Sequence, residues 1–345
     1  MILITGANGV LGKNLYRYLI ENGVHSIKLL DINRSSSYDN IPQEYILYDI
    51  TRSDAPRDFF SNVDTVVHCA SAAPSYSRKD ISKIVIDGTR NLLENSYKNN
   101  IKKFIYISST AVYGIPKKVP VLEIDELQDF HDPYNRAKIA AEKICRNYRE
   151  KGMCIPILRP RTFIGPERLG TFALLYDWAV SGKKFPIIGL GENRYQFLDV
   201  EDLCQAICLC INKESNIVNQ EFNIGARVFG TIAEDYQSVL DRAGYGKKIV
   251  RIPASPALAI LSVLESLKLI PLYKRLYQKM VLDYYVSIDK AVNELGFDPC
   301  FSNAQTLVRG FDWYKENSYK FKNLSGSANN VPWQQGIIAL VKPFF

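Results

Sequence analysis

Short apolar runs recur through the first half of the chain and alternate with longer stretches that have a helical period. The apolar runs cover residues 2–5, 26–31, 45–47, 65–69 and 104–108. The helical stretches include residues 11–22, residues 88–99 and a segment that begins at Asp132. Strands that alternate with helices in this way are joined by right-handed crossovers into a parallel sheet. The pattern therefore predicts an α/β fold with a doubly wound parallel sheet, in which ligands bind at the carboxyl ends of the strands.

The alternation weakens beyond about residue 165. Residues 165–193 are rich in glycine, proline and aromatic side chains, and later stretches mix helices with short strands. We therefore predict a smaller α/β lobe that closes over the sheet and carries substrate contacts, because such sites commonly lie between two lobes. The expected division is residues 1–165 for the sheet domain, to which later segments can return, 166–315 mainly for the substrate lobe, and 316–345 for a C-terminal tail.

Composition narrows the functional classes. The seven cysteines are an odd number scattered along the 345 residues, and neither a secretory signal nor a membrane-spanning apolar run of roughly 18 to 20 residues is recognisable. We therefore expect a cytoplasmic protein. The net charge of +7 is spread along the chain rather than gathered in a block, so nucleic acid is not an expected partner.

Three glycines follow the first apolar run. Gly6, Gly9 and Gly12 have the spacing Gly-x-x-Gly-x-x-Gly, which departs from the Gly-x-Gly-x-x-Gly of the standard dinucleotide fingerprint. Glycine lets backbone approach a pyrophosphate, and the amide dipoles of the following helix favour the negative charge. The loop thus indicates a phosphate site, the alternative being an ordinary strand-to-helix turn.

An acidic residue ends the second apolar run. Asp31 lies 19 residues after Gly12, close to the offset of about 20 at which a carboxylate accepts hydrogen bonds from the adenosine ribose. Because a carboxylate repels a 2′-phosphate, Asp31 favours NAD over NADP. Arg34 is the opposing signal, since an arginine after this strand can serve a 2′-phosphate.

Tyr134 and Lys138 are four residues apart in the predicted helix that Asp132 caps and Pro133 opens. They therefore share one helix face. An ammonium beside a phenol favours the phenolate and lowers the tyrosine pKa from its reference of about 10, which suits acid/base work on an alcohol or ketone. The alternative is an exposed tyrosine beside a solvated lysine.

Three motifs together resemble the extended short-chain dehydrogenase/reductases, the NAD-dependent epimerase/dehydratase superfamily. They are the three glycines, the Ser-Ser-Thr-Ala-Val-Tyr-Gly run of residues 108–114, and the pair Tyr134 and Lys138. The resemblance implies a Rossmann sheet and NAD as cofactor. It also implies that Tyr134 is the acid/base, that Lys138 binds the nicotinamide ribose and tunes Tyr134, and that Ser109 donates a hydrogen bond to the reacting oxygen. A homodimer through the helices that contain Gly88 and Tyr134 follows from the same resemblance.

Further contacts with NAD are implied by position within the family pattern. They come from the glycine loop, the ends of the second and third strands, the loop after the fourth strand, the catalytic helix and the segment after the sixth strand. The residues are Gly6, Asn8, Gly9, Val10, Leu11, Gly12, Asp31, Asp49, Ile50, Ala70, Ser71, Ala72, Lys138 and Pro160.

The substrate positions depart from the family patterns. Thr110 and Ala111 stand where sugar-nucleotide dehydratases carry an Asp-Glu acid pair, so dehydration is disfavoured. Residues 159–162 read Arg-Pro-Arg-Thr where many sugar epimerases have Arg-Tyr-Phe-Asn, and an arginine is displaced by one position ahead of Val-Glu-Asp. A guanidinium can still reach a diphosphate from a neighbouring position. The candidate substrate contacts are Thr110, Arg161, Thr162 and Arg194.

A second branch of the superfamily also has points of resemblance. Leu-Arg-Pro at residues 158–160 and the stretch 253–299 resemble the 3β-hydroxysteroid dehydrogenase type. Residues 257–280 are apolar with late basic residues, and the tail 336–345 is apolar, which is compatible with peripheral contact with a membrane surface. The alternative is an ordinary lobe helix and a packed tail.

The sequence thus predicts an NAD-dependent oxidoreductase or epimerase that acts on a secondary alcohol, with a nucleotide-activated sugar as the first candidate for its small-molecule substrate. Oxidation of a lipid alcohol is the alternative. A non-catalytic NAD-binding protein is a third, which the presence of Tyr134, Lys138 and Ser109 disfavours. His68, inside an apolar run, is predicted to be a packed side chain, and no metal site is expected because the cysteines lack ligand spacing.

Overall fold

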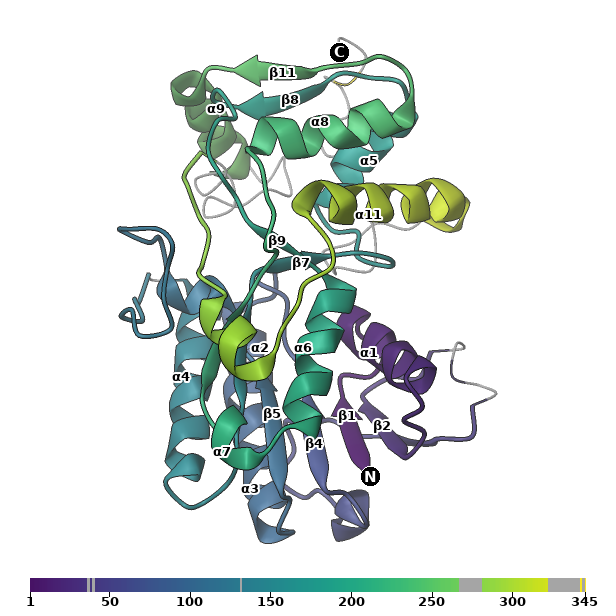
Figure 1. The fold of residues 1–345 in the computed structure, drawn as a ribbon, viewed down its shortest axis with the longest axis vertical. Helices are drawn as coiled ribbons and strands as arrows, with labels where there is room; N and C mark the ends of the chain where they lie inside the picture. The colour runs from purple at the N-terminus through teal and green to yellow at the C-terminus, as the bar shows by residue number, and fades with distance from the viewer. Residues whose placement is uncertain (36–37, 39–40, 131, 267–280, 322–341, 343–344) are drawn as a thin grey trace.

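The computed structural model describes residues 1–345 except 36–37, 39–40, 131, 267–280, 322–341 and 343–344. Figure 1 shows a larger part built around a sheet, which contains the N-terminus, and a smaller part above it. The membrane prediction for 257–280 and for the tail therefore lies largely outside the described residues. Among the helices that are described, none combines the length and apolar character needed to cross a bilayer.

The larger part contains a seven-stranded sheet in the order β10-β6-β5-β4-β1-β2-β3, with every pairing parallel. The strand order reverses between β1 and β4, and this switch point is where doubly wound sheets bind ligands. The predicted doubly wound fold is confirmed. The strands are β1 (Ile2–Thr5), β2 (Ile27–Asp31), β3 (Glu44–Leu47), β4 (Thr65–His68), β5 (Lys103–Ile107), β6 (Ile157–Pro160) and β10 (Glu221–Ile224).

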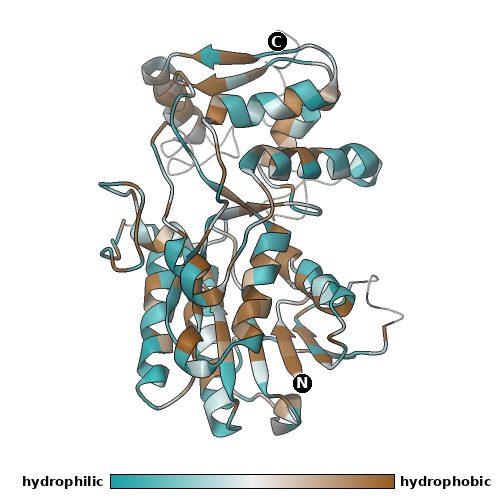
Figure 2. Ribbon diagram, in the orientation of Figure 1, coloured by the Kyte–Doolittle hydropathy of each residue, from teal (hydrophilic) through white to brown (hydrophobic). Residues whose placement is uncertain are grey.

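Helices cover both faces of this sheet. On one face, α1 (Val10–Glu21) and α6 (Val200–Asn212) pack on a core that includes Leu15 and Leu203. On the other face, α3 (Gly88–Lys98) and α4 (Pro133–Arg149) bury Leu93 and Ala141. The strands between them are largely brown in Figure 2 because both of their faces are covered. Shorter segments of this part are η2 (Arg57–Phe60), α2 (Arg78–Ile81), η3 (Ser82–Asp87), η4 (Thr110–Tyr113), α7 (Ser215–Val218) and η5 (Ala291–Leu295).

The smaller part has its own core. Tyr176, Val239, Leu307 and Phe311 meet in it, and a parallel pair, β8 with β11, lies at its outer end in Figure 1. A second parallel pair, β7 with β9, lies between the two parts. The elements are β7 (Thr162–Ile164), α5 (Phe172–Val180), β8 (Phe185–Ile188), β9 (Phe197–Asp199), α8 (Ile232–Ala243), β11 (Ile249–Ile252), α9 (Ala254–Ser266), α11 (Asn303–Asn317) and η6 (Ser318–Phe321).

The chain crosses between the two parts more than once. After β9 it returns through α6 to β10, which is an edge strand of the main sheet. Residues 200–224 therefore lie with the sheet, although the predicted lobe spans 166–315. The predicted division into domains remains a prediction; position 165 lies near the first crossing, whereas position 315 lies inside α11.

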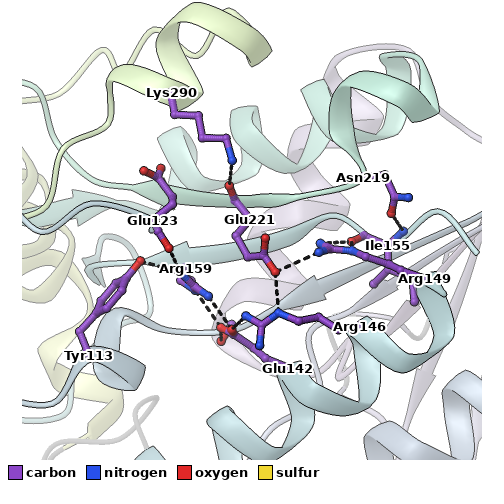
Figure 3. Close-up of polar contacts among 11 residues, drawn as sticks. Tyr113, Glu123, Glu142, Arg146, Arg149, Ile155, Arg159, Asn219, Glu221 and Lys290 are labelled. Carbon is purple, nitrogen blue, oxygen red and sulfur yellow. Dashed lines mark hydrogen bonds and ion pairs between the residues drawn. The ribbon is translucent and has the colours of Figure 1, made fainter. Parts of the chain in front are cut away.

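A buried ion pair joins α4 to the sheet, as Figure 3 shows. The Glu142 carboxylate has no exposed surface, and it accepts two hydrogen bonds from the Arg159 guanidinium of β6, at 3.0 and 2.7 Å. It also accepts from Ser108 Oγ at 2.6 Å and from Arg146 at 2.8 Å. Burial alone would lower the pKa of Arg159, but the hydrogen bonds and charge of Glu142 outweigh burial and raise it. Every acceptor position of the carboxylate is thus occupied by a donor from the sheet or from α4 itself.

A second layer extends this network toward β10. Glu221 accepts from Arg146 and from Arg149, each at 2.9 Å, and Lys290 donates to its backbone carbonyl (Figure 3). Because Arg146 touches both carboxylates, the two layers are connected. The second half of α4, from Glu142 to Arg149, is consequently fixed against β6 and β10.

We predict that Glu142→Gln lowers the free energy of unfolding by about 3–5 kcal/mol, because it leaves the buried Arg159 charge uncompensated. Urea unfolding followed by circular dichroism measures the loss. The control is Glu94→Gln on α3, whose exposed partner is Lys98 and whose expected cost is below about 1 kcal/mol. Equal losses in both variants would contradict the importance assigned to the buried pair.

Candidate functional site

A cavity of about 1110 Å³ runs from the carboxyl ends of the central strands into the smaller part. Its lower end is lined by the β1–α1 loop, the ends of β2, β5 and β6, the loop after β4, and α4. Its upper end is lined by α5, β8, β11 and α9. One continuous space therefore connects the sheet to the predicted substrate lobe.

The glycine loop forms the floor of the lower end. Gly6 has a φ of +69°, and a Cβ on it would lie 2.5 Å from the backbone nitrogen of Ala70. A Cβ on Gly12 would lie 2.3 Å from the carbonyl oxygen of Gly6. Gly6 and Gly12 are therefore required by the packing of the loop itself, in addition to any approach of a phosphate.

The third glycine leaves the start of α1 open. Gly9 is the N-cap residue, with no side chain that caps the helix and no acidic residue in the first turn within residues 9–13, all of which are described. The first amide N–H groups of a helix need acceptors from outside it, and they favour an anion. Val10 and Leu11 of this turn line the cavity, as does Asn8, although the N–H of Asn8 already donates to Asp31. This donor set fits a pyrophosphate.

Asp31 lies at the end of β2 on the cavity wall. Its carboxylate accepts from the backbone N–H of Asn8 at 2.9 Å and of Asn33 at 3.3 Å. Burial raises the pKa of Asp31 above its ordinary value, and these two donors oppose that rise. Arg34, the opposing signal in the sequence, donates to the carbonyl of Tyr38 at 2.7 Å and does not belong to the described lining.

The predicted contacts after β3 and β4 also reach the cavity. They are Asp49, Ile50, Ala70, Ser71 and Ala72. Asp49 accepts from the N–H of Thr51 at 2.9 Å, which fixes its carboxylate in a local turn.

His68 is packed, as the sequence predicts. Its two ring nitrogens lie 2.8 Å from Thr5 Oγ1 and 3.1 Å from Thr89 Oγ1. Burial lowers the pKa of His68 to about 3, so the ring is neutral at physiological pH. Among the described residues, no group of three or more His, Cys, Asp or Glu side chains could hold a metal ion.

Tyr134 and Lys138 lie on the first turns of α4 and both line the cavity. Lys138 is 2% exposed, donates to the carbonyl of Ile107 at 2.7 Å, and has its ammonium 5.9 Å from the centre of the Tyr134 ring. Burial lowers the pKa of Lys138 to about 8, and the nearby Glu142 carboxylate opposes this change. The predicted shared face is thus present, and the lysine is buried rather than solvated.

Ser109 faces the same cavity from the turn after β5. Its Oγ accepts from the backbone N–H of Ala111 at 3.1 Å. Because that bond uses an acceptor position of the hydroxyl, the Ser109 O–H can donate to a ligand oxygen. The three predicted catalytic side chains therefore line the same cavity.

Asn135 joins these elements and was missed by the sequence reasoning. Its side-chain NH₂ donates to the carbonyls of Ala111, at 2.7 Å, and Gln128, at 2.9 Å, and its oxygen accepts from the N–H of Phe130 at 3.1 Å. The residue is fully buried. The sequence offered one signal for this role: Asn135 directly follows Tyr134, so its polar side chain lies on another face of the same helix.

The predicted substrate contacts divide into two groups. Thr110, Arg161 and Thr162 line the cavity, as does Pro160 of the cofactor set. Arg194 is outside the described lining, because its guanidinium stacks 4.7 Å from the Phe229 ring. Of the predicted site residues, all of which are described, it is the one that the structure does not bring to the cavity.

Arg161 reaches the cavity but is largely occupied by the protein. Its guanidinium donates to the carbonyls of Gln196, at 2.9 Å, and Tyr284, at 2.8 Å, and to Thr110 Oγ1 at 3.3 Å. It also stacks 4.0 Å from the Tyr284 ring and 4.6 Å from the Tyr195 ring. Arg161 is 2% exposed, and its main role is structural: it connects the end of β6 to the segments that contain Gln196 and Tyr284.

Comparison with known proteins agrees with this geometry. The model of the NAD dependent epimerase/dehydratase family matches residues 2–225. An uncharacterised protein from Sinorhizobium fredii is 33% identical over 98% of this chain and 85% of its own length. An N-acetyl-α-D-glucosaminyl-diphospho-ditrans,octacis-undecaprenol 4-epimerase from Escherichia coli O157:H7 is 32% identical over 56% of this chain and 57% of its own. The crystal structure of UDP-glucose 4-epimerase from Thermotoga maritima with UDP-glucose superposes with a TM-score of 0.75 at 25% identity, covering 92% of this chain and 99% of that one.

We predict that Gly12→Ala destabilises the protein by about 1–3 kcal/mol, because its Cβ would meet the Gly6 carbonyl and the overpacking must be relieved. Thermal unfolding measures the change. Gly9→Ala is the matched control, since its Cβ would lie 3.1 Å from the same oxygen and its φ of −73° suits any residue. If the Gly9 variant loses as much stability as the Gly12 variant, the close-packing argument is wrong.

Proposed function

The chain belongs to the NAD-dependent epimerase/dehydratase family, and from this premise we propose that it oxidises or epimerises a secondary alcohol of an activated sugar. The observation that carries the proposal is the meeting of Tyr134, Lys138 and Ser109 on one cavity with the glycine loop. A nucleotide-activated sugar is the first class to screen, because UDP-glucose is bound in the Thermotoga structure. When bound, NAD accepts a hydride from the substrate carbon and, in an epimerase, can return it to the opposite face.

The residues that would hold NAD are those of the lower cavity. The open start of α1 fits the pyrophosphate, and Asp31 fits the adenosine ribose. The Asp31 carboxylate supports NAD over NADP, since it repels a 2′-phosphate and Arg34 is not part of the described lining. Calorimetric titration with each dinucleotide tests this preference.

The acid/base work falls to three side chains. The Tyr134 phenolate, which the positive charge of Lys138 stabilises, takes the proton of the substrate hydroxyl and becomes the neutral phenol. The Ser109 O–H donates to the substrate oxygen as it becomes a carbonyl. Burial of Lys138 and the hydrogen bonds of Asn135 fix these groups relative to one another, so little reorganisation is needed during the reaction.

Oxidation of a lipid alcohol is the second candidate, and the apolar upper end of the cavity favours it. The two candidates differ in what they release. Epimerisation leaves no net NADH, whereas oxidation of a lipid alcohol produces it. A screen of UDP-sugars and lipid alcohols, followed by absorbance of NADH and by chromatography of the sugars, separates them.

A homodimer through α3 and α4 is also part of the proposal. These helices are adjacent on one face of the sheet, and Tyr97 and Tyr148 pair between them with ring centres 5.8 Å apart. Two neighbouring helices are the surface that a four-helix contact needs. Sedimentation velocity measures the mass, and a monomer at micromolar concentration would contradict this part.

Tyr134→Phe is expected to lower turnover by about 10²- to 10⁴-fold, the usual contribution of a general acid/base, and to leave NAD affinity nearly unchanged. The readout is the rate with whichever substrate the screen finds. Tyr245→Phe, 58% exposed and outside both the cavity lining and the proposed dimer surface, serves as the control. Unchanged turnover in the Tyr134 variant would exclude the proposed mechanism.

NAD affinity should fall as the pH rises through about 8, because Lys138 loses the proton with which it would bind the ribose hydroxyls. Calorimetric titrations between pH 6.5 and 9.5, a window around that value, test this. Lys138→Met should bind NAD more weakly and with a flat pH profile across the same range. A wild-type profile that is also flat would remove Lys138 from the set of NAD contacts.

A further inference from the structure

The two ends of the cavity differ in chemistry. The lower end carries the carboxylates, hydroxyls and ammonium described above. The upper end is walled by α5, β8, β11 and α9, and none of the described residues that these elements contribute is charged. Six of them are Leu175, Trp178, Ile187, Ile252, Leu261 and Leu264.

Among the described residues, arginines are the candidates to hold a nucleoside diphosphate near the upper end. Arg161 has three of its five N–H donors engaged by carbonyls and a hydroxyl of the protein. Arg168 lines the cavity with its guanidinium 4.5 Å from the Phe163 ring, and Arg194 is outside the described lining. A nucleotide needs partners for its phosphates and its base, because polar groups that lose water without a replacement weaken binding. The described wall offers mostly hydrocarbon instead.

The cavity reaches the surface at an apolar rim. Ile260 of α9 lines the cavity and is 59% exposed. Residues 254–264 of this helix contain no charged side chain, and α9 lies at the edge of the smaller part in Figures 1 and 2. An exposed apolar rim that continues into an apolar wall favours a ligand with a hydrocarbon part that extends to the surface.

We propose that the upper end binds the hydrocarbon part of the substrate, so that the reacting sugar is carried on a lipid rather than on a nucleotide. The inference rests on the proposed function, since it assigns the polar end of the same molecule to Tyr134 and Ser109. The hydrocarbon extends from there between α5 and α9 and leaves past Ile260. Each methylene transferred from water to this wall contributes to affinity by the hydrophobic effect.

A series of alkyl glucosides tests the proposal on the full chain. Octyl, nonyl and decyl β-D-glucoside, each below its micelle concentration, are titrated calorimetrically into the NAD-loaded protein beside UDP-glucose. We expect affinity to rise with chain length, by up to about fourfold per methylene. Affinity that does not depend on chain length would overturn the proposal, as would binding of UDP-glucose that the decyl glucoside fails to displace.

Two variants on α9 localise the hydrocarbon. Ile260→Glu places a charge on the rim and should weaken decyl glucoside binding by about tenfold or more. The bound alkyl chain would either remove water from the new carboxylate or lose its apolar contact at position 260. Val263→Glu is the matched control, since Val263 is 58% exposed on the same helix but does not line the cavity. NAD affinity should be unchanged in both. Equal effects of the two variants would overturn the placement.

Trp178 distinguishes a hydrocarbon from a nucleobase. This residue is 1% exposed, and its indole Nε1 has no hydrogen-bond partner in the structure. A nucleobase carbonyl at the upper end could accept from it, whereas a hydrocarbon cannot. We expect Trp178→Phe to leave decyl glucoside binding within about twofold, the effect of a small apolar exchange. Weakened UDP-glucose binding in this variant would instead place the base there and overturn the proposal.

The two proposals fail separately. If Tyr134→Phe retains turnover while affinity rises with alkyl chain length, the hydrocarbon site is supported and the proposed mechanism is wrong. If Tyr134→Phe abolishes turnover of a UDP-sugar and alkyl chain length has no effect on affinity, the mechanism is supported and the lipid carrier is excluded.

Discussion

The position of α4, the helix that contains Tyr134 and Lys138, depends on a buried carboxylate. The Glu142 carboxylate accepts hydrogen bonds from Arg159 of β6, from Ser108 after the end of β5 and from Arg146 of its own helix. Ser108 directly precedes Ser109, and Pro160, which lines the cavity, directly follows Arg159. The ion pair thus sits behind the cavity wall and holds three of its segments together. A buried pair of this kind gives little net stability compared with an apolar core, but it fixes geometry because any misalignment leaves a charge unpaired.

The two ends of the cavity follow from different parts of the chain. The lower end is built from loops that directly follow parallel strands, so its residues are local in sequence to β1, β2, β4 and β5. The upper end is built from elements of the smaller part that pack around their own core. Arg161, which directly follows β6, connects the end of that strand to the segments that contain Gln196 and Tyr284, because its guanidinium binds both of their carbonyls.

Local features of the sequence were enough to predict the sheet and the residues that line the lower end of the cavity. Gly6, Asp31 and Tyr134 are each defined by their neighbours in the chain, and the periodicity around them predicts where each strand or helix begins. Arg161 and Arg194 could not be placed in this way, since their partners lie more than 30 residues away in the sequence. The pairing of Glu142 with Arg159 was invisible for the same reason: 17 residues and a change from helix to strand separate them.

Glu142 also affects the chemistry through Lys138. The two residues are one helical turn apart on α4, and the carboxylate opposes the fall in the Lys138 pKa that burial causes. Without this charge, desolvation would favour the neutral amine more strongly, and a neutral amine cannot stabilise the Tyr134 phenolate. The same group therefore holds the helix in place and keeps its lysine protonated near neutral pH. Under the proposed mechanism, Glu142 is a positioning residue, because a substitution there would change activity without any contact to the substrate. Its effect on turnover would be separable from its effect on stability through the pH profile.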